Sequence, residues 1–437
     1  FGYRPDMPRE YVNNHDLPQY DERAGMVLNM WRNTWASPNP DPVGDDNDNV
    51  RKFVYYIRSV ICDGDINAAN WVISWIADIF RDPCNKPSTC LVLVGKHGAG
   101  KSFMGEVLLK MLLRDKFISV DGIEAFNNDF NAEMSGKILV QADEVTHNSS
   151  SSAVSEKLKR IISQKSITIN PKNMAKREER DMRRFLFTTN HETTAIKMDG
   201  AQDRRYTVIK VSDKFVQDID FFGKLAAWAN SGSWTADVMK WLLTYDGYDP
   251  SVKHRAYKTV QRDVMISTYI PWWVKALALA AHDDNFAIGD YPWTYAFRVE
   301  DTQTLHKSMT ANQTAWPDRV DVINLSIWMA RASSDKHVKV VDIQRFMRDM
   351  VSGDSELIRG NILGANNRLI PIPSKVAQFK SRSHVLAALV KAHGRPLLMA
   401  INSDLGDEYI EAVNNGNIPE LATSRPIDSS KRMDGEY

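Results

Sequence analysis

The spacing of apolar and polar positions changes several times along this chain, and each change predicts a different kind of element. Short, branched apolar runs are typical of buried strands and occur at 90–94, 117–120, 138–142, 167–169, 184–189 and 206–211. Apolar residues recur at helical spacing over 50–60, 66–80, 103–114, 221–229, 235–243 and 270–281. Strands that alternate with helices between residues 88 and 212 predict a parallel α/β sheet with helices on both faces.

These patterns divide the chain into five predicted parts. Residues 1–49 form an N-terminal extension, in which SPNPDPVGDDNDN at 37–49 has the composition of a linker. A small helical unit at 50–87 precedes the α/β core at 88–212. A mainly helical region follows at 213–417, where 340–352 and 375–392 are candidates for a winged-helix-like unit. The tail at 418–437 is predicted to be disordered.

Composition narrows the class of protein without naming a ligand. With 437 residues, 43% hydrophobic and 25% charged, the chain has the make-up of a soluble globular protein of two or three domains. Its formal net charge is zero, so any contact with nucleic acid must come from a local patch. No apolar run approaches 18 residues, so no membrane span is expected.

The cysteines and the first residue bear on where the protein works. Cys62, Cys84 and Cys90 form no CxxC pair, which favours a reducing, intracellular compartment and no zinc or disulfide framework. The chain begins at Phe1 and no signal-peptide pattern follows. We expect it to be a piece of a longer polypeptide.

The first candidate chemistry is a glycine-rich loop at 95–102, which reads Gly-Lys-His-Gly-Ala-Gly-Lys-Ser. It lies between a predicted strand and a predicted helix, the context that a phosphate-binding loop requires and that a chance glycine turn does not explain. Lys101 is expected to reach the β- and γ-phosphates, and the Ser102 hydroxyl to hold Mg²⁺. The residues predicted to bind a nucleoside triphosphate are Gly95, Lys96, His97, Gly98, Ala99, Gly100, Lys101 and Ser102.

An acid pair follows the predicted strand KILVQA. Asp143 is expected to bind Mg²⁺ through a water ligand, and Glu144 to polarise the attacking water as a general base. An apolar strand that ends in two acids is a weak signal alone, but it is strong after a phosphate-binding loop. The acid pair, together with the lack of an Asn-Lys-x-Asp motif, favours ATP over GTP.

Two further motifs carry polar groups at strand ends. FLFTTN ends in Asn190, which can hydrogen-bond the γ-phosphate and the attacking water, although alone it would be read as a turn residue. DRRY contains Arg204 and Arg205, and an arginine delivered to a neighbouring subunit would stabilise the transition state. We assign Arg204 as this arginine finger and Arg205 as a nucleotide sensor in its own subunit. The sequence leaves open which of the two crosses an interface, or whether Asp203 merely holds a surface pair.

A basic segment lies between the second and third motifs. The strand at 167–169 leads into a turn at 170–173, and residues 170–184 carry six basic and three acidic side chains. Basic residues at a loop tip can hold phosphates through salt-sensitive contacts that do not depend on sequence. A solvated charged loop is the alternative.

The order GKHGAGKS, ILVQADE, FLFTTN and DRRY resembles the superfamily 3 helicases of viruses and phages. More narrowly, it looks like the helicase half of phage and prophage primase-helicases related to poxvirus-type and virulence-associated primases. The segment VLNMWRNTWASPNP at 27–40 is similar to the one that precedes the helical collar in that family. The likeness covers residues 25–212.

This resemblance implies an AAA+-like core behind a helical collar, assembled into a homo-hexamer that hydrolyses ATP at its subunit interfaces. It also implies 3′→5′ travel on single-stranded or forked DNA, a primase or primase-polymerase domain N-terminal to this chain, and work in the cytoplasm of a host cell. The segment between the second and third motifs would line the pore, with Lys172, Lys176 and Arg177 as DNA contacts. The family's histidine or aromatic is replaced here by Asn173 and Met174, which favours phosphate tracking over base stacking.

The sequence therefore predicts an ATP-dependent DNA helicase of phage or mobile-element replication. Two alternatives stay open. One is an ATPase with the same core that remodels or loads a protein partner. The other is a nucleotide-gated ring that clamps DNA without separating strands.

Overall fold

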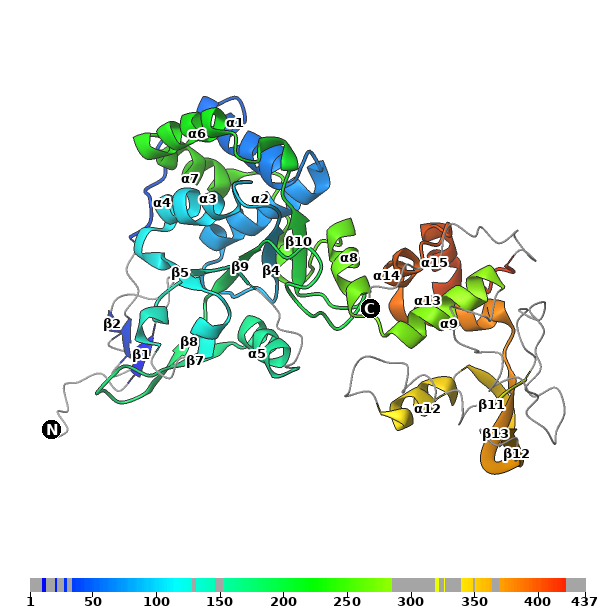
Figure 1. Ribbon diagram of the computed structural model, residues 1–437. Coiled ribbons are helices and arrows are strands. Elements are labelled where there is room, and N and C mark those ends of the chain that lie inside the picture. Colours follow the sequence, from blue (N-terminus) through cyan, green and yellow to red (C-terminus); the bar gives the residue numbers. More distant parts are fainter. Residues whose placement is uncertain are drawn as a thin grey trace. The chain divides into compact units, whose positions relative to one another are not determined.

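The structure, a computed structural model, describes residues 10–12, 20–21, 27–29, 34–127, 131–145, 152–284, 319–321, 326, 339–348, 350–363 and 369–421. The chain forms two compact units, 1–266 and 267–437, which are considered separately (Figure 1).

A five-stranded parallel sheet forms the centre of the first unit. Its order is β10-β4-β9-β6-β5, so β9 lies between β4 and β6. The strands are β4 (Cys90–Val94), β5 (Phe117–Asp121), β6 (Leu139–Asp143), β9 (Arg184–Thr189) and β10 (Tyr206–Lys210). The predicted parallel α/β sheet is confirmed, and each predicted strand of the sheet falls within one residue of its observed limits.

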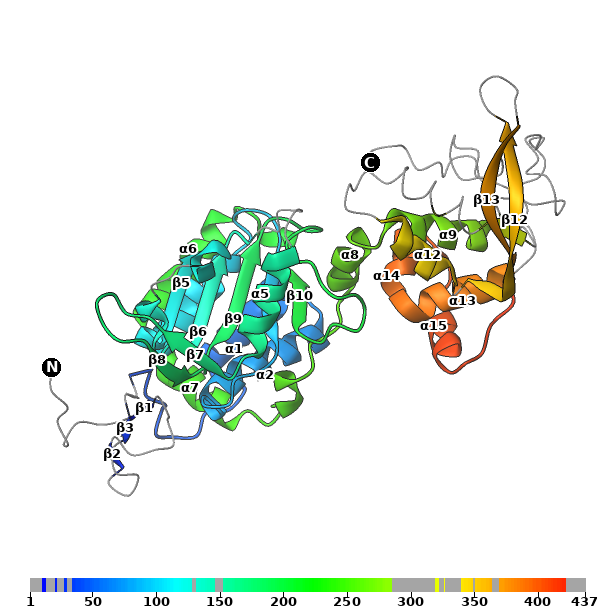
Figure 2. The ribbon, with the colours of Figure 1, turned by 90° about the horizontal axis from the view of Figure 1, so that it is seen from below.

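Side chains of the central strands feed two separate cores, one on each face of the sheet. Leu91 and Leu93 of β4 pack with the helices α1 (Asp48–Tyr55), α2 (Ile66–Arg81) and α7 (Trp234–Thr244). On the other face, Val92 packs with α5 (Ser152–Ser163) and α8 (Val260–Thr268). This alternation is what a buried strand covered on both faces requires, and Figure 2 shows helices on either side of the sheet.

The remaining elements of this unit are short or peripheral. The turn after α1 is π-helical (Tyr56–Ile61), and the helix after the glycine-rich loop consists of α3 (Lys101–Phe103), a π-helical turn (Met104–Leu109) and α4 (Lys110–Leu113). Short 3₁₀ turns occupy Arg114–Lys116, Glu124–Asn127, Ala132–Met134, Asp213–Phe215 and Pro250–Lys253. The N-terminal strands β1 (Glu10–Val12), β2 (Tyr20–Asp21) and β3 (Val27–Asn29) form a small sheet in the order β1-β3-β2.

The predicted strand at 167–169 exists but belongs to a hairpin outside the main sheet. β7 (Ser166–Ile169) pairs antiparallel with β8 (Arg177–Arg180), and residues 170–176 connect them. Ile167 and Ile169 face the core below the sheet, whereas Ser166 and Thr168 are exposed.

The sequence predicted that a separate helical region begins at residue 213, but the helices that follow the core belong to the first unit. α6 (Ile219–Ser231) and α7 lie in the first unit, and Trp234 stacks on Phe53 of α1 with ring centroids 6.4 Å apart. Trp234 also packs on Trp228, at 5.0 Å. Large aromatic side chains thus tie α6 and α7 to the helical layer, and the boundary lies at residue 266 instead of 212.

The predicted linker at 37–49 is also a docked segment. The side-chain amides of Asn39, Asn47 and Asn49 all donate to the Asp237 carboxylate, at 2.8, 3.2 and 2.9 Å. The asparagines of this segment therefore bind Asp237 on α7 instead of forming a free linker. Composition alone could not predict this contact, because Asp237 lies far away in the sequence.

The second unit combines helices with an antiparallel sheet in the order β11-β13-β12 (Figure 1). Its elements are α9 (Trp272–Asp283), β11 (Arg319–Asp321), α12 (Val340–Arg348), β12 (Val351–Leu363), β13 (Leu369–Phe379), α13 (Arg382–His393), α14 (Arg395–Ala400) and α15 (Asp407–Asn414). A helix, a long hairpin and a helix thus follow one another where a winged-helix-like unit was predicted, although 375–379 is strand.

Two further predictions concern the ends of this unit. The disordered tail predicted at 418–437 lies outside the described residues from 422 onward, whereas Leu421 packs against the helices. Among the described residues, no single helix has the length and apolar composition to cross a membrane, although the bent pair α8 and α9 meets those criteria jointly.

Replacing Asp237 with Ala should lower the free energy of unfolding by about 1–3 kcal/mol, because three amide donors lose their acceptor. Amide donors hold the pKa of Asp237 below its ordinary value. This contribution is therefore present above the ordinary carboxyl pKa and is lost as pH falls through the lowered value. Urea unfolding at pH 7 measures the effect, and Asp220→Ala, which removes a first-turn acid from α6, is the matched control. Equal effects of the two substitutions would contradict the cluster's role.

Candidate functional site

Polar side chains from three neighbouring strands meet at one edge of the sheet. The glycine-rich loop follows β4, Asp143 and Glu144 end β6, and Asn190 follows β9. Because these strands are parallel and adjacent, their carboxyl ends lie together. They line a cavity of about 240 Å³, whose walls are His97, Gly98, Gly100, Lys101, Ser102, Phe103, Asp143, Glu144, Thr188, Thr189 and Asn190.

The loop backbone is held in place by groups from elsewhere in the unit. Gly98 and Gly100 have φ angles of 74° and 95°, a backbone conformation that residues with a side chain rarely adopt. The Tyr56 hydroxyl, from the helical layer, donates to the Gly100 carbonyl at 2.7 Å. The backbone amide of Gln217 donates to the Gly98 carbonyl at 3.2 Å. A Cβ on Gly100 would lie 2.8 Å from the Phe222 ring. The loop is thus clamped from outside the motif.

The Lys101 side chain folds back over the start of the glycine-rich loop. Its ammonium donates to the carbonyls of Gly95 and Lys96, at 2.6 and 2.7 Å, and to the Asn190 Oδ1 at 2.8 Å. Burial lowers the pKa of Lys101, and the nearby Asp143 carboxylate opposes that shift. All three direct acceptors are neutral, so the ammonium has no carboxylate among its hydrogen-bond partners and can bind an anion that enters the cavity.

Ser102 and Asp143 place hydroxyl and carboxylate oxygens side by side. The Ser102 Oγ donates to the two oxygens of Asp143 at 3.0 and 3.3 Å. The hydroxyl and the carboxylate are oxygen ligands of the kind that Mg²⁺ prefers. With only two ligands from the protein, the ion could also bind water and phosphate oxygens. The sequence prediction that these residues share a metal site is compatible with this geometry.

Glu144 occupies a strained position at the mouth of the cavity. It is exposed and its φ is 52°, a left-handed conformation that costs a non-glycine residue about 1–2 kcal/mol. The next residue, Val145, is anchored by its amide to the Thr188 carbonyl at 2.9 Å. Backbone strain that the surrounding structure enforces is common at functional sites. The left-handed φ of Glu144 therefore supports a chemical role for its side chain.

The amide of Asn190 connects two parts of the glycine-rich loop. Its Oδ1 accepts from Lys101, while its Nδ2 lies 3.0 Å from the His97 Nε2. The sequence predicted His97 as a loop residue but not its pairing with Asn190. That pairing depends on β9 being next to β4 and has no signal in the motif itself.

Arg204 and Arg205 are not brought into this cavity. They precede β10, so they lie at the opposite edge of the sheet, and a five-residue strand separates the two edges by about 16 Å. Arg205 pairs with Asp199 and Asp203, at 3.2 and 3.0 Å, whereas Arg204 is exposed and has no ion pair among the described residues. This position does not support a sensor role for Arg205 in its own subunit.

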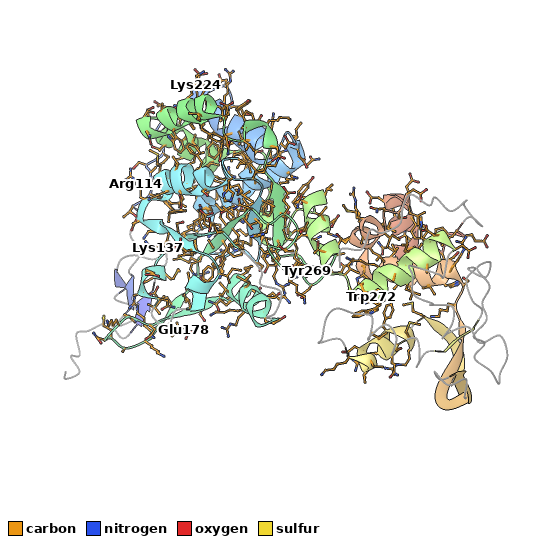
Figure 3. The ribbon with its side chains drawn as sticks, in the orientation of Figure 1. Arg114, Lys137, Glu178, Lys224, Tyr269 and Trp272 are labelled. Atoms are coloured by element: carbon orange, nitrogen blue, oxygen red, sulfur yellow. The ribbon has the colours of Figure 1, made fainter. Side chains whose placement is uncertain are left out.

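The hairpin presents two lysines that have no ion pair among the residues that the structure describes. Lys172 and Lys176 are exposed in the loop between β7 and β8, and Met174 between them is 68% exposed. Figure 3 marks this hairpin at Glu178. Asn173 has a φ of 62°, which turns the chain sharply at the tip.

The other four basic residues of this segment bond to the fold, and Arg180, although exposed, donates to the Asn85 side chain at 2.9 Å. Arg177 donates to Glu179 at 2.8 Å and to Ser135 at 3.1 Å. Arg183 and Arg184 are buried. They pair with Asp181 and Asp78, each at 2.8 Å. The DNA contact predicted for Arg177 is therefore less accessible than those of the lysines, and a count of charges between 170 and 184 overstates the basic surface.

A comparison with protein families concerns the same part of the chain. A model of the family of unknown function DUF5906 matches residues 93–205, which run from the end of β4 to Arg205. A DNA primase-polymerase of Nitratiruptor phage NrS-1 is 27% identical over 154 residues, 35% of this chain. The match spans 21% of the phage protein's length, so the likeness concerns one part of that protein.

Solved structures extend the likeness to most of the fold. The apo structure of the NrS-1 C-terminal region aligns with a TM-score of 0.59 over 85% of this chain and 84% of that chain, at 18% identity. Its A form aligns with a TM-score of 0.57 at 16% identity and the same coverage. At this identity the alignments show a shared fold. The chain is thus similar to a phage primase-polymerase in part of its sequence and to that protein's C-terminal region in fold.

Replacing Gly100 with Ala should lower the free energy of unfolding by about 2–4 kcal/mol, from the left-handed backbone and the contact with Phe222. Gly64→Ala is the matched control, because Gly64 has a φ of 87° and nothing within 4 Å of the added Cβ. It should cost only about 1 kcal/mol. Denaturant unfolding measures both, and the addition of Phe222→Ala should restore part of the Gly100→Ala loss. Equal losses in the two single variants would show that Phe222 does not clamp the loop.

Proposed function

We propose that this chain hydrolyses ATP as a ring-forming motor that moves on single-stranded DNA during phage or mobile-element replication. The observation that carries the proposal is the meeting of Lys101, Ser102, Asp143, Glu144 and Asn190 in one cavity. They come from three segments of the sequence, and together they form the set of groups that phosphoryl transfer to water needs.

Each group has a role that follows from its contacts. Lys101 would exchange its neutral acceptors, the loop carbonyls and Asn190, for the β- and γ-phosphates. Ser102 and Asp143 would hold Mg²⁺, which when bound neutralises charge on the phosphate oxygens. Glu144, at the mouth of the cavity, would accept the proton of the attacking water. Asn190, once released by Lys101, would hydrogen-bond the γ-phosphate and that water.

The exposed Arg204 supports a ring. It lies at the opposite edge of the sheet from the cavity of its own subunit, so as an arginine finger it would serve the cavity of a neighbour. Its side chain has no ion pair among the described residues and is free to do so. An arginine supplied by a neighbour makes hydrolysis depend on assembly. The hexamer and the 3′→5′ direction rest on the resemblance to superfamily 3 helicases.

DNA as the track is supported by the hairpin and by the comparisons. Lys172 and Lys176 present two exposed cations at the hairpin tip, without an ion pair in the described part of the chain, which suits contact with successive phosphates. The relative from phage NrS-1 is named a DNA primase-polymerase, which favours a replication role for this chain as well.

Glu144→Gln should lower the kcat of ATP hydrolysis about 100-fold or more, because the water loses its general base, while ATP binding persists. Lys101→Ala should weaken ATP binding itself. Phosphate release and equilibrium nucleotide binding distinguish the two effects. Wild-type levels of hydrolysis in the Glu144→Gln protein would refute the role of Glu144.

The double substitution Lys172→Ala with Lys176→Ala should abolish stimulation of ATP hydrolysis by single-stranded DNA and leave basal hydrolysis intact. Loss of two phosphate contacts should also reduce the salt slope of DNA binding by about 1.4, at about 0.7 for each contact. Lys110→Ala with Lys224→Ala, which removes two exposed lysines elsewhere, is the matched control. Unchanged stimulation in the hairpin variant would favour a protein partner at the hairpin instead of DNA.

Mixing Arg204→Ala subunits with Glu144→Gln subunits should restore part of the hydrolysis that each variant lacks alone. In a mixed ring, some cavities have an intact Glu144 and receive Arg204 from the neighbour. Activity measured across mixing ratios should peak at intermediate composition. A flat, inactive profile would contradict the role of Arg204 in the neighbouring site.

A further inference from the structure

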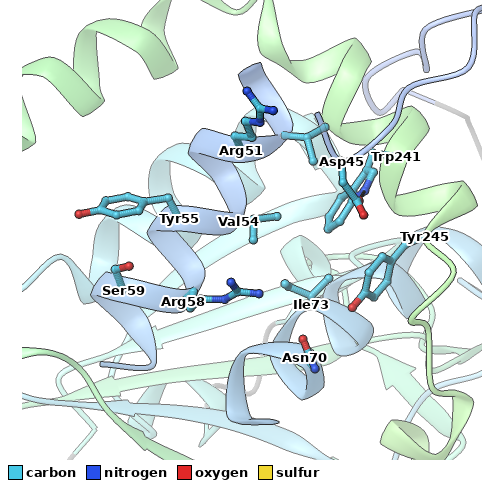
Figure 4. Close-up of a pocket in the computed structure, with 11 residues that line it drawn as sticks. Asp45, Arg51, Val54, Tyr55, Arg58, Ser59, Asn70, Ile73, Trp241 and Tyr245 are labelled. Carbon is cyan, nitrogen blue, oxygen red and sulfur yellow. Dashed lines mark hydrogen bonds between the residues drawn. The ribbon is translucent and has the colours of Figure 1, made fainter. Parts of the chain in front are cut away.

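A second cavity lies in the helical layer of the first unit, and none of its lining residues lines the cleft at the sheet edge. Its volume is about 430 Å³, within the range of small-molecule sites. α1 and the π-helical turn after it form one side, α2 the floor, and α7 with Tyr245 the other side (Figure 4). The docked segment 37–49 contributes Asp45 to the rim.

The wall on the α7 side is aromatic, and Asp45 at the rim adds a carboxylate acceptor. The rings of Trp241 and Tyr245 lie 4.8 Å apart at 43°, and Trp241 itself is buried. Val54 of α1 and Ile73 of α2 add apolar lining. The Trp241 Nε1 donates to the Asp45 Oδ1 at 2.7 Å, and no cation pairs with Asp45 among the described residues. A planar aromatic ligand with N–H groups would find a stacking surface on the half-buried Tyr245 ring and a hydrogen-bond acceptor in Asp45.

Arg58 provides the opposite charge from across the cavity. Figure 4 shows its side chain extending from the π-helical turn toward Ile73 and Tyr245. It is exposed and has no ion pair among the described residues, whereas Arg51 at the rim pairs with Asp48 at 3.7 Å. Burial and Asp45 raise the pKa of Tyr245, so this phenol stays neutral and does not neutralise Arg58. A free guanidinium in the wall selects an anionic ligand over a cationic one.

We propose that this cavity binds a nucleotide, with the base against Tyr245, its N–H groups directed to Asp45, and the phosphate on Arg58. The apolar lining, the half-buried Tyr245 ring, the Asp45 carboxylate and the Arg58 guanidinium, which has no ion pair in the described part of the chain, match the parts of a nucleotide. Two sources share this chemistry, a free nucleotide and a nucleotide within single-stranded DNA. The site is independent of the sheet-edge cavity, and its existence does not require the proposed ATP hydrolysis.

The test uses the full chain with Lys101→Ala, which weakens phosphate binding at the sheet edge. Calorimetric titration with dAMP, and separately with an oligothymidylate single strand, measures binding to the second cavity. Arg58→Ala should weaken binding about tenfold or more, because a charge-assisted contact with phosphate is lost. Arg58→Lys should recover part of it. Tyr245→Leu should also weaken binding by roughly tenfold through loss of stacking.

Lys52 is an exposed cation on α1, just before the turn that carries Arg58, and it does not line the cavity. Lys52→Ala is therefore the matched control and should bind both probes as the parent does. Thermal unfolding checks that Tyr245→Leu remains folded, and Arg58 is exposed, so its removal leaves the fold intact. Arg58-dependent binding of dAMP alone identifies a free nucleotide as the source, and Arg58-dependent binding of the oligonucleotide alone identifies the strand. Absence of binding by both probes at millimolar concentration, or binding that Arg58→Ala and Tyr245→Leu leave unchanged, overturns the proposal.

Discussion

The adjacency of β4, β9 and β6 as parallel strands is the constraint on which the candidate site depends. Adjacent parallel strands run in the same direction, so their carboxyl ends lie at the same edge of the sheet, and β9 lies between the two strands that carry the glycine-rich loop and the acid pair. This order brings Asn190 between Lys101 and His97. It also leaves Ser102 within hydrogen-bonding distance of Asp143. A slip of one strand by one residue would turn these side chains to the wrong face.

The helical layer is the second support of the site. Tyr56 bonds the Gly100 carbonyl, and Phe222 fills the space beside Gly100. Both residues lie outside the α/β core as the sequence defined it. The layer therefore does more than cover the sheet, because a change in its packing would move the loop that holds Lys101. The same layer contains the second cavity, so a ligand there would contact the turn that begins with Tyr56.

Local patterns predicted the strands and the motif residues well because those features are encoded locally. Continuous apolar runs mark buried strands, and the glycine-rich loop combines a strand, a turn and a helix within a few residues. Features that depend on distant partners were missed. Arg184 was counted with the basic residues of 170–184, yet it is buried and donates to Asp78 and to backbone carbonyls of residues 82–85. The Asn-rich segment looked like a linker because its acceptor, Asp237, lies almost 200 residues away. Tyr56 carried no signal for a contact with the loop.

The most direct test of the proposed motor is ATP-driven strand displacement on a forked DNA, with Lys101→Ala as the control. The account predicts that the wild-type chain separates the strands when ATP and Mg²⁺ are present and that the Lys101→Ala protein does not. Hydrolysis of ATP by the wild type without any strand separation, on forks of either polarity, would contradict the motor and favour the remodelling of a protein partner.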